Sequence, residues 1–104
     1  MARVEIFGGV CGFTTIIRAS LEQKRMVQLE VESECPNWQK VQGQLKRVDA
    51  YKELFGKLHE GEVYRLSSPF IPHPACLVPA GIMKAIEVAA GLALPRDGFI
   101  RVTG

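Results

Sequence analysis

Three segments in the first third of the chain alternate apolar and polar residues, which is the pattern of a β-strand with one buried face. They are Arg3 to Ile6, Phe13 to Leu21 and Met26 to Ser33. Because the links between them are short, we predict a three-stranded antiparallel meander with one face in water. On that outer face, we expect Arg18 to pair with Glu30 or Glu32 across neighbouring strands.

Two later segments show the period of amphipathic helices. In the first, Pro36 opens a helix, and Asp49 either caps a second helix to Phe55 or lies within one continuous helix. The apolar positions that recur at helical spacing in this region are Trp38, Val41, Leu45 and Val48. The second segment, Ala80 to Ala90, is the most apolar helix and is expected to pack against the sheet.

Two further strands are predicted towards the C-terminus. Glu62 to Leu66 is interpreted as a short strand, and Phe99 to Val102 as the strand that closes the sheet. A chain of 104 residues suits one compact domain. We therefore predict a single α+β domain over residues 1–104. Its antiparallel sheet has about four strands, the N-terminal meander plus the C-terminal strand, with roughly two or three helices packed on one face.

Composition excludes several classes of function. Hydrophobic residues make up 47% of the chain and charged residues 23%, as in ordinary globular proteins. A net charge of +2 is too small for a typical nucleic-acid-binding protein, which carries a concentrated basic face. No stretch approaches the ~20 apolar residues that span a bilayer, and the N-terminus lacks a signal-peptide pattern. We therefore expect a cytoplasmic protein with neither a nucleic-acid nor a membrane partner.

The three cysteines, Cys11, Cys35 and Cys76, lie in predicted loops rather than inside strands or helices. An odd number of cysteines in a reducing compartment argues against a disulfide framework. Cys11 and Cys35 follow the first and third strands of the meander, which run in the same direction, so both loops should emerge at one edge of the sheet. Cys76, just before the apolar helix, could reach that edge. We therefore predict that the three thiols converge.

Converging thiols favour a metal site. Three thiolates and one further ligand complete the coordination of a zinc ion or an iron–sulfur cluster. His73, three residues before Cys76, is the candidate for a fourth ligand. Cys35 at a helix N-terminus faces unpaired N–H groups that favour its thiolate. The close Cys-x-x-Cys pairs of most zinc sites are absent, so three separately buried thiols remain the competing interpretation.

No Ser-His-Asp arrangement and no general base accompanies the thiols, so we assign no catalytic residue and leave enzymatic activity open. Two alternatives to metal binding remain. The first is a metal-free thiol, sulfur-carrier or redox protein that uses Cys35. The second is an interaction module with structural cysteines, which could form a homodimer through a sheet edge or the Trp38 helix.

Four motifs in the chain are familiar as a set. They are Val10–Phe13, Glu32–Pro36, His73–Pro79 and Glu87–Pro95. Together they resemble a small uncharacterised prokaryotic family associated with anaerobes, which implies that Cys11, Cys35 and Cys76 act together but supplies no reaction. Locally, the strand followed by Cys35-Pro36 and a helix is similar to the start of sulfur-carrier proteins of the TusA type, although Trp38 stands where their motif has a second proline.

Overall fold

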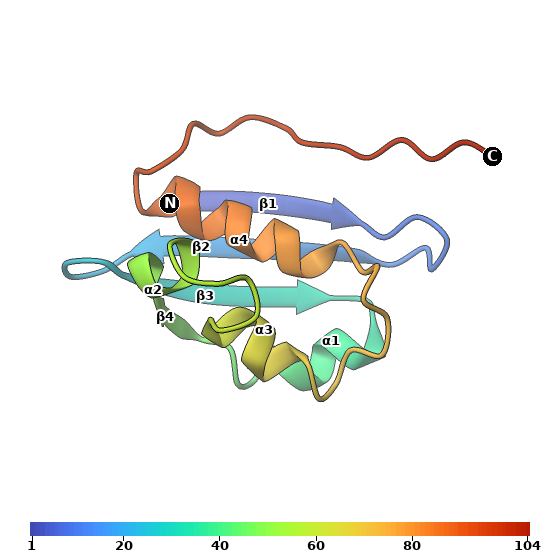
Figure 1. Ribbon diagram of the computed structural model, residues 1–104, viewed down its shortest axis with the longest axis horizontal. Helices are drawn as coiled ribbons and strands as arrows, with labels where there is room; N and C mark the ends of the chain where they lie inside the picture. The colour runs from blue at the N-terminus through green and yellow to red at the C-terminus, as the bar shows by residue number, and fades with distance from the viewer.

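The computed structural model describes residues 1–104 and confirms the predicted α+β fold. One antiparallel sheet has the strand order β1-β2-β3-β4, and four helices accompany it (Figure 1). The strands are β1 (Ala2–Phe7), β2 (Thr14–Leu21), β3 (Met26–Ser33) and β4 (Arg47–Asp49). The helices are α1 (Pro36–Val41), α2 (Ala50–Leu54), α3 (Glu62–Ser67) and α4 (Val78–Ala89). None of these helices combines the length and the apolar character needed to cross a membrane.

All four helices lie on one face of the sheet, and the core fills the space between the two layers (Figure 1). The alternation predicted for the meander is confirmed, because alternate residues of β2 and β3 are buried. Helix α4 crosses over β1 and β2. Gly81 permits its close approach, since a Cβ at this position would collide with the side chain of Ile6 on β1. The sheet–helix contact therefore depends on a glycine inside the longest helix.

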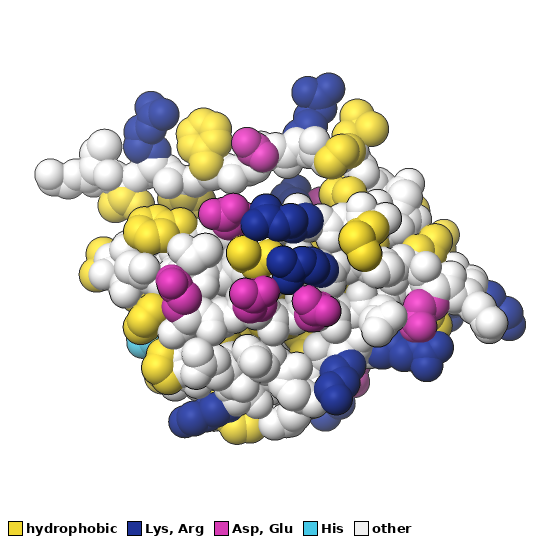
Figure 2. All heavy atoms as spheres, turned by 180° about the vertical axis from the view of Figure 1, so that it is seen from behind, with side chains coloured by type: hydrophobic (Ala, Val, Ile, Leu, Met, Phe, Trp, Pro, Cys, Tyr) yellow, Lys and Arg dark blue, Asp and Glu magenta, His cyan; other side chains and the backbone are white.

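The opposite face of the sheet carries no helix and is covered by charged side chains (Figure 2). The sequence predicted that Arg18 on β2 pairs with Glu30 or Glu32 on β3, and in the structure it pairs with both, at 3.1 and 3.0 Å. Its hydrogen bond to Glu32 is the main cause that raises the pKa of Arg18 above the usual value. The charges account for this face staying in water while the other face builds the core.

The segment from Trp38 to Asp49 departs from the prediction of a long helix. Helix α1 ends at Val41, residues 42–44 turn, and Val48 enters the sheet as the centre of β4 opposite Val27. The helical spacing of the apolar residues was real, but Gly43 favours the turn that redirects the chain. Asp49 then caps α2, as expected, by accepting hydrogen bonds from the N–H groups of Tyr51 and Lys52.

The fourth strand of the sheet is therefore β4, and the prediction of a C-terminal strand at Phe99–Val102 is wrong for this chain on its own. Residues 92–104 leave α4 as an extended segment without helix or strand. Figure 1 shows this segment passing outside β1 in the direction of that strand. The residues have strand-forming side chains, but their backbone makes no ladder hydrogen bonds with the rest of the chain.

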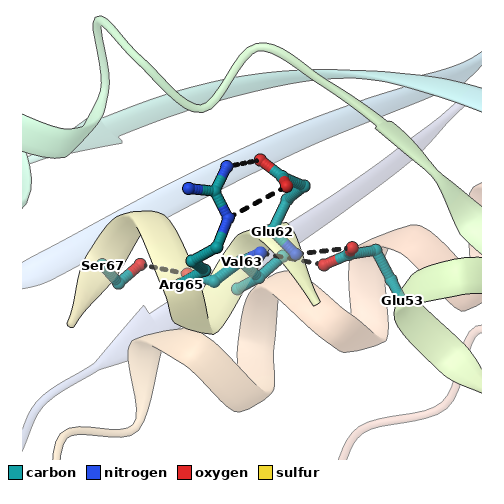
Figure 3. Close-up of polar contacts among 5 residues, drawn as sticks. All are labelled: Glu53, Glu62, Val63, Arg65 and Ser67. Atoms are coloured by element: carbon teal, nitrogen blue, oxygen red, sulfur yellow. Dashed lines mark hydrogen bonds and ion pairs between the residues drawn. The ribbon is translucent and has the colours of Figure 1, made fainter. Parts of the chain in front are cut away.

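The segment predicted as a strand at Glu62–Leu66 is helix α3 (Figure 3). Its first N–H groups are capped from a distance by Glu53 of α2, whose carboxylate accepts from Glu62 N at 2.7 Å and from Val63 N at 2.8 Å. Glu53 is only 6% exposed. This long-range cap explains why local sequence signals missed the helix, because the capping carboxylate lies nine residues before Glu62.

Candidate cysteine site

The three cysteine-bearing segments emerge at the same end of the molecule (Figure 1). The β1–β2 turn, the β3–α1 junction and the α3–α4 loop all lie at the end of the sheet where β1 and β3 terminate. None of the cysteines is inside a helix or strand, as the sequence predicted, and none forms a disulfide. The topology of the meander therefore brings three thiol-bearing loops to one edge.

Cys76 and Trp38 make the defining contact of this end. The indole Nε1–H of Trp38 donates to Cys76 Sγ at 3.3 Å, although the two residues are 38 positions apart in the chain. The Trp38 ring is 1% exposed and belongs to the core, while Cys76 is half-buried against that core. A buried indole N–H needs an acceptor, and here the acceptor is a sulfur. The contact orients the thiol and ties the α3–α4 loop to α1.

Cys35 stands one helical turn before Trp38, as the N-cap residue of α1. Its backbone N–H donates to Ser33 Oγ at 3.1 Å, and Ser33 in turn shares a hydrogen bond of 2.7 Å with Thr15 on β2. The Cys35 side chain makes no capping hydrogen bond and is half-buried against the core. Its sulfur is therefore held at the junction of β3 and α1 and is not used as a hydrogen-bond acceptor by the helix N-terminus.

The position of Cys35 depends on the end of β3 being fastened to β2. Glu34 N donates to the Thr14 carbonyl at 3.1 Å, and the Glu34 carboxylate accepts from Thr14 N at 2.7 Å. Helix α1 has only six residues, so its dipole stabilises a Cys35 thiolate less than a longer helix would. The anchoring of Cys35 is therefore due to the sheet rather than to the helix.

Cys11 occupies the tight turn between β1 and β2 and is exposed. Its sulfur lies against Gly8 of the same turn, where any Cβ would collide with it. Gly9 and Gly12 have φ angles of 82° and 74°, a conformation that glycine adopts without strain. The glycines flanking Cys11 therefore shape the turn that presents the thiol to solvent.

His73 and Cys76 lie in one turn, closed by a hydrogen bond of 3.1 Å from Cys76 N to the His73 carbonyl. The imidazole is exposed. In the arrangement of this structure, no group of three or more His, Cys, Asp or Glu side chains is close enough to hold a metal ion. The shared loop edge is observed, whereas the convergence of three thiols and His73 on one ion stays a prediction.

Sequence reasoning did not identify Trp38 as part of this site and treated it as a core residue. A signal was present, because Trp38 follows Cys35 by three residues and so lies one helical turn further along. That spacing places the indole beside the helix start, but only the fold shows that Cys76 is the residue its N–H reaches.

A separate surface cleft of about 390 Å³ lies between α2, α3 and α4. Its lining includes Leu54, Tyr64, Met83, Lys84 and Glu87, and no cysteine. Lys84 and Glu87 form an ion pair of 3.2 Å there, as expected for a solvated helix face. The cleft is open and carries no cluster of reactive groups, so the cysteine end remains the candidate site.

The model of a protein family of unknown function matches residues 2–102, which agrees with the resemblance to an uncharacterised family. No curated protein and no solved structure matches the chain. The function must therefore be argued from the residues at the cysteine end.

Proposed function

The chain belongs to the DUF6951 family of unknown function, and from the geometry of its cysteine end we propose that it binds a thiophilic metal centre, a zinc ion or an iron–sulfur cluster. Cys35 and Cys76 are the two ligands held at the edge of the core. Cys11 is the third, delivered by the β1–β2 turn. His73 is the candidate for the fourth position.

The single observation that carries this proposal is the hydrogen bond from the Trp38 indole to Cys76 Sγ. Sulfur accepts hydrogen bonds weakly as a thiol and more strongly as a thiolate, because the charge-assisted bond is the stronger one. N–H groups that point at ligand sulfurs orient them and tune the metal. The contact is therefore most favourable in the ionised form of Cys76 that a metal ion requires.

The arrangement implies that binding closes the site. Zinc–sulfur bonds of about 2.3 Å place the sulfurs of one tetrahedral site about 3.8 Å apart, and no three candidate ligands are grouped for a metal ion in this structure. The element best suited to move is the glycine-flanked turn that carries Cys11, whereas Cys35 and Cys76 are held by the sheet end and by Trp38. Metal binding is thus expected to order the β1–β2 turn.

Cobalt(II) titration of the reduced protein under anaerobic conditions tests the proposal. We expect thiolate-to-cobalt charge-transfer absorption with one equivalent bound, and a simultaneous change in the fluorescence of Trp38, the only tryptophan. Cys11→Ser, Cys35→Ser and Cys76→Ser should each weaken binding by more than roughly tenfold, and Trp38→Phe by about tenfold. His59→Ala alters the only other histidine and is the matched control for His73→Ala.

The outcome that would contradict the proposal is equally clear. Protein that binds no cobalt, zinc or reconstituted cluster, with the alkylation rate of each thiol unchanged by added metal, removes the metal site. Such a result with Cys35 alone reacting fast, and a persulfide detectable on it by mass, would favour the sulfur-carrier function instead. The observation behind that second candidate is the Cys35 thiol, half-exposed at a helix start with no hydrogen bond of its own.

A further inference from the structure

The outer edge of β1 and the C-terminal segment 93–104 both carry backbone N–H and C=O groups without a hydrogen-bond partner. We propose that the C-terminal segment of one copy of this chain adds as a strand to the free edge of β1 in a second copy, reciprocally, to form a two-fold symmetric dimer. This inference concerns the end of the chain and β1, and it is independent of the cysteine site.

The free edge of β1 can be identified from the register. Gly8 N donates to the Phe13 carbonyl at 2.9 Å, in line with the register that pairs Ile6 with Thr15. Even-numbered residues of β1 therefore bond to β2, because hydrogen-bonded pairs alternate in an antiparallel ladder. It follows that Arg3, Glu5 and Phe7 turn their N–H and C=O groups away from the sheet. The other edge, β4, has three residues and runs directly into α2, so β1 is the long open edge.

The C-terminal segment has the side chains of a strand and the exposure of an unpaired one. Phe99, Ile100 and Val102 are 80%, 69% and 87% exposed, although aromatic and β-branched residues favour a half-buried pleated surface. No backbone group of residues 93–104 appears in a hydrogen bond. Figure 2 shows the segment standing off the body of the protein with apolar side chains in solvent. Such a segment is costly to leave unpaired beside an open edge.

The two faces of the segment match the two faces of the sheet at β1. Ile100 and Val102 would lie on the helix side, where Val4 stays only half-buried while its neighbours Ala2 and Ile6 are buried. On the other side, the Arg101 guanidinium already lies over the Phe99 ring, 5.7 Å from its centroid, so the two share a face. That face would bring Arg101 to Glu5, which β1 presents on the charged side of the sheet and which Arg3 already approaches at 3.6 Å. In this arrangement Ile100 and Val102 lie on the apolar side of β1, and the Arg101 guanidinium lies near the Glu5 carboxylate.

A second copy fits better than the chain's own edge. In the single chain, the segment already passes outside β1 yet forms no ladder with it (Figure 1). Residues 93–104 span about 40 Å when extended, roughly twice the length of β1 at 3.3 Å per residue. Gly91, with a φ of 76°, and Pro95 separate the segment from α4. Reciprocal exchange pairs the free edge of β1 in each copy with the C-terminal segment of the other copy. The two-fold interface then leaves no edge or segment open to a third copy.

Light scattering of the full chain after size-exclusion chromatography, over a range of concentrations, measures the assembly. We expect a species of twice the 11.5 kDa monomer mass. The double variant Ile100→Asp/Val102→Asp should raise the dimer dissociation constant by on the order of 100-fold, because it places charge on the apolar side of the added strand. Hydrogen exchange should show protected amides in residues 98–103 of the wild-type dimer.

The matched pair Glu5→Pro and Glu5→Ala isolates the edge itself. Proline removes the outward-facing N–H of residue 5 and leaves the β1–β2 ladder intact, since edge strands accept proline at such positions. Glu5→Pro should dissociate the dimer markedly more than Glu5→Ala does, while both variants stay folded by circular dichroism. A dimer indifferent to Glu5→Pro overturns the proposal. A monomer at all concentrations also overturns it, whether its C-terminal amides exchange freely or are protected against the chain's own β1.

Discussion

Replacing Trp38 with alanine should lower the free energy of unfolding by about 3–5 kcal/mol, the usual cost of deleting a large aromatic side chain from a core. Trp38 is the largest of the fully buried side chains, at 1% exposure, and lies where α1 meets the core. Its loss removes apolar burial, leaves a cavity and frees Cys76 from its hydrogen-bond donor. Urea denaturation followed by circular dichroism measures the change, because the variant has no tryptophan fluorescence.

Trp38→Phe is the control that separates packing from the hydrogen bond. Phenylalanine keeps most of the apolar contact and lacks the N–H, so we expect a smaller loss of about 1–2 kcal/mol. It should nevertheless slow the alkylation of Cys76 at neutral pH, because the reactive thiolate loses the N–H donor that stabilises it. If Trp38→Ala cost less than about 1 kcal/mol, the indole would not be the core residue that its burial indicates.

The parts of the fold that were predictable are those that follow from local alternation. The meander, its inward residues and the pairing of Arg18 with a glutamate of β3 follow from period-two patterns and short links. The shared edge of the cysteine loops follows from the same topology, since the first and third strands of a meander run in the same direction. These features need no information from distant parts of the chain.

The errors lie where a distant residue decides the outcome. Val48 fits a helical stripe and a strand equally well, and its pairing with Val27 on β3 selects the strand. Helix α3 depends on the carboxylate of Glu53. Phe99–Val102 has strand propensity, but propensity does not say which edge a strand will join or in which copy. Tertiary contacts outweigh local preference at Val48 and at the start of α3.

The candidate site divides in the same way. That Cys11, Cys35 and Cys76 share one end of the molecule could be argued from strand order, whereas the contact between Trp38 and Cys76 could not. It depends on how the α3–α4 loop packs on α1, which no periodicity reports. The distances among the thiols depend on turn conformations that the glycines do not fix. Sequence patterns therefore predict that the three cysteine loops share one edge of the sheet, but not whether their sulfurs can bind one metal ion.

Replacing Glu53 with alanine should lower the free energy of unfolding by about 3 kcal/mol, more than its place at the end of a five-residue helix suggests. The carboxylate is buried, and each of its oxygens accepts one backbone N–H at the start of α3 (Figure 3). Alanine removes two charge-assisted hydrogen bonds and leaves the N–H groups of Glu62 and Val63 without partners. Chemical denaturation followed by Trp38 fluorescence measures the loss.

Glu62→Ala is the matched control, because it removes a neighbouring carboxylate from the same helix start. Glu62 pairs with Arg65 at 2.6 Å on the exposed side of α3, and exposed pairs of this kind contribute about 0–1 kcal/mol. Glu53→Gln should fall between the two, since its amide oxygen can accept one of the two bonds while its NH₂ group faces the other donor. Equal losses in Glu53→Ala and Glu62→Ala would contradict the capping role.

The capping role also makes a prediction about the cysteine end. Helix α3 contacts both α1 and α4, and the loop that follows it carries Cys76. If Glu53 holds the start of α3, its loss should loosen that loop and raise the alkylation rate of Cys76 well before global unfolding. Cys35, which is half-buried against the core at the end of β3, should react at an unchanged rate. A parallel rise at Cys35 would instead indicate that Glu53→Ala unfolds the whole protein, and the link between the cap and the Cys76 loop would fail.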